Sequence, residues 1–214
     1  MNKMVIFDLD GTLLDTLDDL HDSVNYALRT NNFPERTLEE VRSFVGNGIR
    51  LLIERSVPDN TSNELINKTF ECFKTYYGEH CNDKTRIYPG VLNVLKQLKE
   101  RNYKIAVLSN KAQYAVTRLC NIYFSDILDD AIGAQENVRK KPEPDALYKC
   151  AEKHNIGLNN IIYVGDSDVD ILTARNAGVK GIAVSWGFRT KDFLISNNAE
   201  RIADTPEELL NMLL

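Results

Sequence analysis

The chain has 214 residues, 43% of them hydrophobic, and it carries 26 basic and 31 acidic side chains, for a net charge of -5. This length allows one domain with a sizeable insertion or two small domains. The acidic balance and the lack of a basic tail argue against a nucleic-acid-binding protein. Because the N-terminus shows no apolar segment of signal-peptide or membrane-span length, we expect a cytoplasmic protein with no membrane partner.

The cysteines and histidines show no pattern of a metal site. The cysteines are scattered and form no C-x-x-C pair, so we expect free thiols and no zinc site. The histidines show no metal-ligand grouping, and we expect them to be structural or exposed. These residues are Cys72, Cys81, Cys120, Cys150, His21, His80 and His154.

The first element is an apolar run at 5–9, and it brings two aspartates, Asp8 and Asp10, to the residues just before Gly11. Such a run before a glycine turn is typical of a buried strand. Two carboxylates at this spacing can share a metal while one attacks a substrate and the other moves a proton. Alone, the pattern also fits a solvated strand end.

A helical insertion is predicted between about residues 16 and 84, flanked by a core made of 1–15 and 85–214. Thr37 and Glu40 have the spacing of a capping box. An insertion with two connections can close over a substrate and exclude water. Arg50 lies in this insertion and could bind a carboxylate or be an ordinary surface arginine. Helical patterns cover 17–30, 38–45, 48–56 and 63–77.

After residue 84, short apolar runs alternate with helical patterns, which predicts an α/β fold with a Rossmann-like parallel sheet. The strand-like runs are 105–108, 161–164 and 181–184, with weaker candidates at 131–133 and 200–203. The helical patterns are 91–101, 113–119, 146–154, 171–177 and 207–214.

Polar residues follow several of these strands, where a parallel sheet gathers functional groups. Ser109 and Asn110 follow the run at 105–108, although a serine before a helix is more often a cap. Lys141 directly precedes Pro142, which stiffens the chain and can aim the lysine at the site. The alternative is that Lys141 is exposed at the surface. Asp166 and Asp170 follow the run at 161–164, and their spacing predicts a shared helical face. Carboxylate oxygens favour Mg²⁺ over zinc or copper.

Asp8-Leu9-Asp10-Gly11-Thr12, together with the later clusters, resembles the signature of the haloacid dehalogenase superfamily of phosphohydrolases. The likeness covers nearly the whole chain and is nearest to the phosphoglycolate phosphatase-like branch, which has a small α-helical cap. It implies that Asp8 attacks phosphorus to form an aspartyl phosphate. It also implies that Asp10 is the general acid and base and binds the metal through its backbone carbonyl.

The resemblance assigns the remaining polar residues to binding roles. Ser109 and Asn110 would contact the transferring phosphoryl group, and Lys141 would offset negative charge. Asp166 would hold Mg²⁺ with Asp8, and Asp170 would orient Asp166 or a metal-bound water. The backbone N–H of Gly11 or Leu9 would reach a phosphate oxygen.

We therefore expect a Mg²⁺-dependent phosphomonoester hydrolase acting on a small phosphorylated metabolite, with 2-phosphoglycolate as the leading substrate. Pyrophosphate, sugar phosphates and nucleotides are alternatives, as is a phosphomutase reaction. From other classes, we consider a non-enzymatic binding module, and a glycosyltransferase or nuclease using Asp8 and Asp10 as a metal motif. The chain would act as a monomer or a homodimer.

Overall fold

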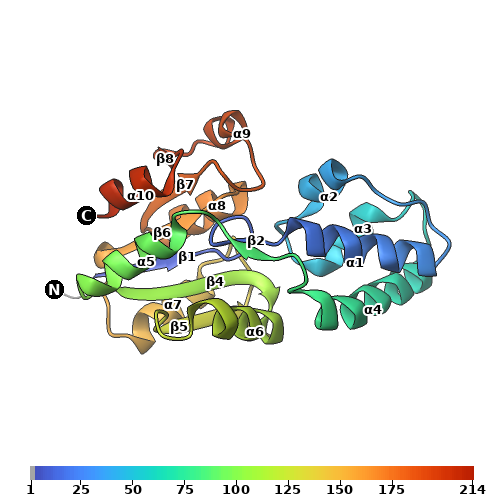
Figure 1. Cartoon of the computed structure of the whole chain (residues 1–214), viewed down its shortest axis with the longest axis horizontal. Coiled ribbons are helices and arrows are strands. Elements are labelled where there is room, and N and C mark those ends of the chain that lie inside the picture. Colours follow the sequence, from blue (N-terminus) through green and yellow to red (C-terminus); the bar gives the residue numbers. More distant parts are fainter. Residues whose placement is uncertain (1–2) are drawn as a thin grey trace. The chain divides into compact units, whose positions relative to one another are not determined.

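The computed structural model describes residues 3–214, and the chain divides into two compact units. Residues up to Leu14 combine with Ile87–Leu214 in an α/β unit, and Asp15–Arg86 form a helical unit. These limits lie within two residues of those expected from the sequence. Each unit is described by itself below (Figure 1).

The α/β unit contains a six-stranded sheet in which all neighbouring strands run parallel. Its order is β5-β4-β1-β6-β7-β8, so the first strand in the chain lies in the middle. This is the doubly wound order, which creates a crevice beyond the carboxyl ends of the central strands. The strands are β1 Met4–Phe7, β4 Lys104–Ala112, β5 Asp130–Ala134, β6 Ile161–Gly165, β7 Lys180–Val184 and β8 Ile202–Ala203. The α/β fold expected from the sequence is confirmed.

The register of the central strands aligns their carboxyl ends. Phe7 of β1 pairs with Val107 of β4 and with Val164 of β6. Asp8 follows Phe7 directly, and Asp166 lies two residues beyond Val164. The three strands therefore bring residues from distant parts of the sequence to one edge.

Helices cover the sheet, and the buried cluster on one face joins β1, β4 and β6 to α7 and α8. The cluster includes Ile6, Leu108, Leu147, Tyr163 and Ala174. The helices of this unit are α5 Val91–Glu100, α6 Gln113–Phe124, α7 Asp145–Lys153, α8 Asp168–Ala177, α9 Lys191–Ser196 and α10 Pro206–Leu213, with a 3-10 turn at Leu158–Asn160.

The helical unit consists of four α-helices with amphipathic sequences. Thr37 and Glu40 form the expected capping box at the start of α2. The buried Asp19 carboxylate accepts hydrogen bonds from the backbone N–H groups of Lys84 and Thr85, at 2.9 Å each, and so ties the end of the unit to its first helix. The helices are α1 Leu17–Thr30, α2 Leu38–Phe44, α3 Ile49–Ser56 and α4 Asn63–His80.

Two short strands that the sequence did not predict carry the chain between the units. They are β2 Leu14–Asp15 and β3 Arg86–Ile87, which pair in a two-stranded sheet. An ion pair of 2.9 Å joins Arg86 to Asp15 beside this pairing. Both connections are therefore held together in one ribbon.

Other elements differ from the sequence prediction in length. Strand β4 continues through Ser109 and Asn110 to Ala112, with an irregular register against β5 after Leu108. Helix α9 was missed because its six residues are too few for a periodic pattern.

Among residues 3–214, none of the helices combines the length and apolarity that a bilayer crossing would need.

Candidate active site

Three buried carboxylates converge beyond the carboxyl ends of β1 and β6. One oxygen each from Asp8, Asp166 and Asp170 lies within 4.8 Å of the others. Asp8 follows β1, Asp166 lies in the turn after β6, and Asp170 is in the first turn of α8. The doubly wound sheet thus builds an acidic cluster at its central crevice.

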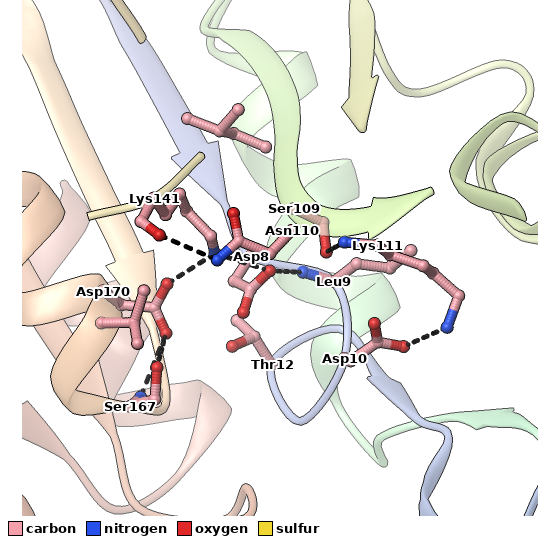
Figure 2. Close-up of polar contacts among 12 residues, drawn as sticks. Asp8, Leu9, Asp10, Thr12, Ser109, Asn110, Lys111, Lys141, Ser167 and Asp170 are labelled. Carbon is pink, nitrogen blue, oxygen red and sulfur yellow. Dashed lines mark hydrogen bonds and ion pairs between the residues drawn. The ribbon is translucent and has the colours of Figure 1, made fainter. Parts of the chain in front are cut away.

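Lys141 enters this cluster from the segment before α7. Its ammonium lies 2.9 Å from Asp8 Oδ1 and 2.7 Å from Asp170 Oδ1, and only 3% of its side chain is exposed. It also donates a hydrogen bond of 3.0 Å to the Tyr163 hydroxyl. Figure 2 shows Lys141 and Asp170 on one side of Asp8. The alternative of a surface-exposed Lys141 is wrong, whereas Arg139 and Lys140 beside it are exposed.

Burial and charge together perturb the titration of this cluster. Burial raises the pKa of Asp8 to about 7, with Lys141 opposing the rise and Asp170 adding to it. Burial, followed by Asp170 and Asp8, raises the pKa of Asp166 well above its ordinary range. Burial opposes the charged form of Lys141, but Asp170 and Asp8 outweigh it and hold its pKa well above the usual value. The ionised forms of Asp8 and Asp166 are therefore disfavoured while Lys141 is the cation beside them.

The donor set fits a hard divalent cation. Three carboxylates and one ammonium sum to a net charge of -2 when all are ionised, which a divalent cation would neutralise. Carboxylate oxygens are ligands that Mg²⁺ prefers, and no thiol or imidazole belongs to this group. The geometry is thus compatible with a metal held by Asp8 and Asp166.

Asp170 is committed to contacts with protein groups. Its Oδ1 lies within 3.1 Å of the Tyr163 hydroxyl as well as near Lys141, and its Oδ2 accepts hydrogen bonds from the backbone and hydroxyl of Ser167. The expected helical face shared by Asp166 and Asp170 is wrong, because Asp166 precedes α8. The capping box between Ser167 and Asp170 brings the carboxylates together instead.

Asp10 points away from the three-carboxylate cluster. Its Oδ1 lies 2.8 Å from the ammonium of Lys111, whose side chain is 3% exposed. Figure 2 shows this pair on the opposite side of Asp8 from Lys141 and Asp170. The sequence prediction gave Lys111 no role. Its position directly after Ser109 and Asn110, at the end of a predicted strand, could have marked it as a site residue.

Ser109 and Asn110 are both buried at the end of β4. The Ser109 hydroxyl accepts a hydrogen bond of 3.2 Å from the Lys111 backbone, and the Asn110 amide donates one of 3.0 Å to the Lys141 carbonyl. Helix α6 begins after Ala112 without a side-chain cap, so Ser109 does not cap it. Asn110 therefore links β4 to the segment that carries Lys141.

The turn after Asp10 requires glycine, because it has a positive φ and passes close to the Asp166 carboxyl. Gly11 has φ +81°, and a Cβ there would lie 2.4 Å from Asp166 Oδ2. Its N–H donates to the Leu14 carbonyl at 2.8 Å, so the structure gives it a partner other than the expected phosphate. The Leu9 N–H donates to Asp8 Oδ1 at 2.7 Å.

Two further residues hold Asp166 in place. The Thr12 hydroxyl donates to its Oδ1 at 3.2 Å, and the Phe188 backbone N–H donates to its Oδ2 at 2.7 Å. Phe188 lies in the loop after β7, and Trp186 in the same loop donates to the Thr12 carbonyl at 3.1 Å. The sequence prediction missed these contacts because they join separate segments of the chain, and two of the three link residues more than 150 positions apart.

Arg50 belongs to the helical unit and is engaged within it. Its guanidinium lies 2.6 Å from Glu54, donates to Asn67 and stacks over the Phe70 ring. Its side chain is 39% exposed. Glu54 and Asn67 thus occupy the Nε and Nη1 donors of Arg50.

Comparisons with known proteins assign the chain that carries this fold and carboxylate cluster to a family of hydrolases. The family model for haloacid dehalogenase-like hydrolases matches residues 5–184, and the chain belongs to this family. It is similar to the phosphoglycolate phosphatase of Vibrio vulnificus (strain CMCP6), with 33% identity over 99% of this chain and 96% of that protein. It is also 33% identical to the phosphoglycolate phosphatase of Haemophilus influenzae (strain 86-028NP), over 99% of this chain and 98% of that protein.

A solved structure shows the same likeness in three dimensions. A crystal structure from Lactobacillus delbrueckii subsp. bulgaricus, described as a candidate phosphoglycolate phosphatase, is 34% identical to this chain. It aligns with a TM-score of 0.95 over 100% of this chain and 99% of that chain. The arrangement of both units along the sequence is therefore shared with a relative of nearly equal length.

Proposed function

We propose that the protein is a Mg²⁺-dependent phosphomonoester hydrolase that acts on 2-phosphoglycolate through an aspartyl-phosphate intermediate. The observation that carries this proposal is the Asp8 carboxyl, buried beside Lys141 in a group of three carboxyls whose ionised forms a divalent cation would stabilise. The names of the relatives support the substrate. Pyrophosphate, sugar phosphates and nucleotides are the alternative substrates, and a phosphomutase is the alternative reaction.

In the first step, one oxygen of Asp8 attacks phosphorus and the P–O bond to the leaving group breaks. Both hydrogen-bond donors to Asp8, Lys141 and the Leu9 N–H, engage Oδ1, which leaves Oδ2 as the attacking oxygen. Fixing Oδ1 orients the nucleophile and reduces the entropy lost on reaching the transition state. When bound by Asp8, Asp166 and the Asp10 carbonyl, Mg²⁺ would neutralise charge on the transferring phosphoryl group.

Asp10 protonates the leaving oxygen and then takes a proton from the water that hydrolyses the aspartyl phosphate. Its pairing with Lys111 fixes the carboxylate on the side of Asp8 opposite Lys141 (Figure 2). Ser109 and Asn110 bind the phosphoryl oxygens, and Lys141 offsets their charge. We assign Asp170 to positioning Lys141, because Oδ1 of Asp170 contacts its ammonium.

The helical unit serves as a cap over the substrate in this proposal. Its two connections pair as β2 and β3, which gives the unit a single ribbon about which to move. Closing excludes water from the reacting phosphate, and reopening releases the product. Arg50 is our candidate for the substrate carboxylate, since its present partner, Glu54, is itself a carboxylate.

The test is phosphate release from 2-phosphoglycolate, pyrophosphate, sugar phosphates and nucleotides, measured in Mg²⁺ and in EDTA. We expect kcat/KM for 2-phosphoglycolate to exceed the others by at least about tenfold, a difference of ~1.4 kcal/mol in transition-state binding. EDTA should abolish all turnover. If another compound is hydrolysed faster, that compound replaces 2-phosphoglycolate as the proposed substrate. If no compound releases phosphate, the proposal that the protein is a phosphomonoester hydrolase is wrong.

Mg²⁺ should stabilise the protein more at about pH 8 than at about pH 5.5. Burial raises the pKa of Asp8 from 3.8 to about 7 on folding. The folded state therefore takes up a proton between these values, and without metal this group lowers stability as pH rises from about 4 to about 7. A bound cation removes this penalty because it takes the place of the proton.

The measurement is Tm in EDTA and in excess Mg²⁺ at both pH values. For a chain of this size each kcal/mol raises Tm by about 2–4 °C, so an increment of several degrees is expected at the higher pH. The Asp166→Asn variant should lose most of the increment. An equal increment in this variant would contradict the assignment of Asp166 as a metal ligand.

Lys111→Met should lower kcat by about 10- to 100-fold, because Asp10 loses the cation that positions its carboxylate. KM should change much less, and Lys111→Arg should restore part of the rate. The matched control is Lys104→Met. Lys104 is the first residue of the same strand, at the end away from Lys111, and pairs with Asp129 at 2.8 Å. If both methionine variants lower kcat equally, Lys111 has no specific role in the reaction.

A further inference from the structure

A second group of side chains that could ligate a metal lies apart from the carboxylate cluster, at the edge strand β5. One ligand atom each from Asp130, Cys150 and His154 lies within 4.8 Å of the others. Asp130 begins β5, Cys150 lies in α7 and His154 is the C-cap residue of that helix. The sequence pattern did not reveal this grouping of His154, because β5 supplies the third residue from outside the helix.

We propose that Asp130, Cys150 and His154 form a second metal site that binds Zn²⁺, independently of the phosphatase chemistry. Cys150 and His154 are four residues apart, which is the spacing with which a helix presents two ligands on one face. A thiolate, an imidazole and a carboxylate form a donor set that suits zinc and disfavours Mg²⁺ and Ca²⁺. The two metal sites would thus select different ions.

The imidazole and the carboxylate lie near the spacing that a zinc ion requires, and the Cys150 sulfur lies within 4.8 Å of both. Tetrahedral bonds of roughly 2.0–2.3 Å place ligand atoms about 3.4–3.8 Å apart, and the His154 Nε2 to Asp130 Oδ2 distance is 3.2 Å. A cavity of about 240 Å³ adjoins the group, and its lining includes Asp130 and Cys150. This space gives a water access to the fourth coordination position.

Two features oppose metal binding and set its strength. Lys153 pairs with Asp130 Oδ2 at 2.9 Å, but its side chain is 63% exposed, so this pair is weak and can be displaced. Burial, followed by Asp130, raises the pKa of the Cys150 thiol to about 12. Zinc must therefore replace the thiol proton, which leaves to solvent when the metal–sulfur bond forms.

The test is titration of the full-length protein with Co²⁺ in excess Mg²⁺, followed by thiolate-to-cobalt charge-transfer absorption. Mg²⁺ blocks the carboxylate cluster, and this band reports only a metal bound to sulfur. We expect one equivalent of Co²⁺ to produce the band and one equivalent of Zn²⁺ to abolish it. Asp8→Asn should leave the band unchanged. Absence of the band in the wild type would overturn the proposal.

Variants separate this site from a general reaction of buried thiols. Cys150→Ser should abolish the band, whereas Cys120→Ser, at another buried cysteine, should keep it. His154→Gln changes a residue at a helix end and should weaken Co²⁺ binding at least about tenfold, which keeps the test valid if Cys150→Ser does not fold. Lys153→Met should tighten binding about three- to tenfold, because it frees Asp130. A band that persists in Cys150→Ser, or Co²⁺ affinity unchanged in His154→Gln, would overturn the site.

Discussion

Replacing Asp8 by asparagine should lower phosphate release by roughly 10⁴-fold or more and leave the fold intact. The amide has nearly the shape of the carboxylate, but it is too weak a nucleophile to form the aspartyl phosphate. Because burial raises the pKa of Asp8 to about 7, the ionised group costs free energy in the metal-free fold. The variant should therefore keep or exceed the wild-type Tm in EDTA.

The measurement pairs kcat on 2-phosphoglycolate with Tm in EDTA and in Mg²⁺. Asp168→Asn is the matched control, because Asp168 lies at the start of α8 but outside the three-carboxylate cluster. It should retain activity within a few-fold. If Asp8→Asn keeps a tenth or more of the wild-type rate, Asp8 is not the nucleophile.

Lys141→Met should destabilise the protein by about 3–5 kcal/mol and remove most of the activity. Its ammonium contacts Asp8 and Asp170, and its removal leaves these two buried carboxyls without that cation. At this chain length the loss corresponds to a fall in Tm of roughly 6–20 °C. Activity falls as well, because the phosphoryl charge loses a partner.

The neighbouring lysine provides the control for this prediction. Lys140 is exposed, so Lys140→Met should change stability by less than about 0.5 kcal/mol. The double variant Lys141→Met with Asp170→Asn should recover part of the lost Tm, because it removes one excess carboxylate, while activity stays low. Equal Tm values for the two single methionine variants would show that the buried ion pairs do not stabilise the fold.

Local patterns were sufficient to predict most of the elements. The run before Asp8 became the central strand β1, and the helical pattern at 17–30 became α1 with the same limits. Elements whose formation depends on partners were harder to predict. The two-residue strands β2 and β3 exist because they pair with each other, and β4 extends beyond its apolar run because its later residues pair with β5.

The sequence by itself determined the α/β class, the helical insertion and the positions of the polar residues after the strands, because each depends on the order of side chains along one segment. Tertiary structure alone decided which of those residues meet. It buried Lys141 between Asp8 and Asp170, paired Asp10 with Lys111 and joined Asp130 to Cys150 and His154. Such contacts depend on strand order and register, because parallel strands bring distant segments to one edge of the sheet.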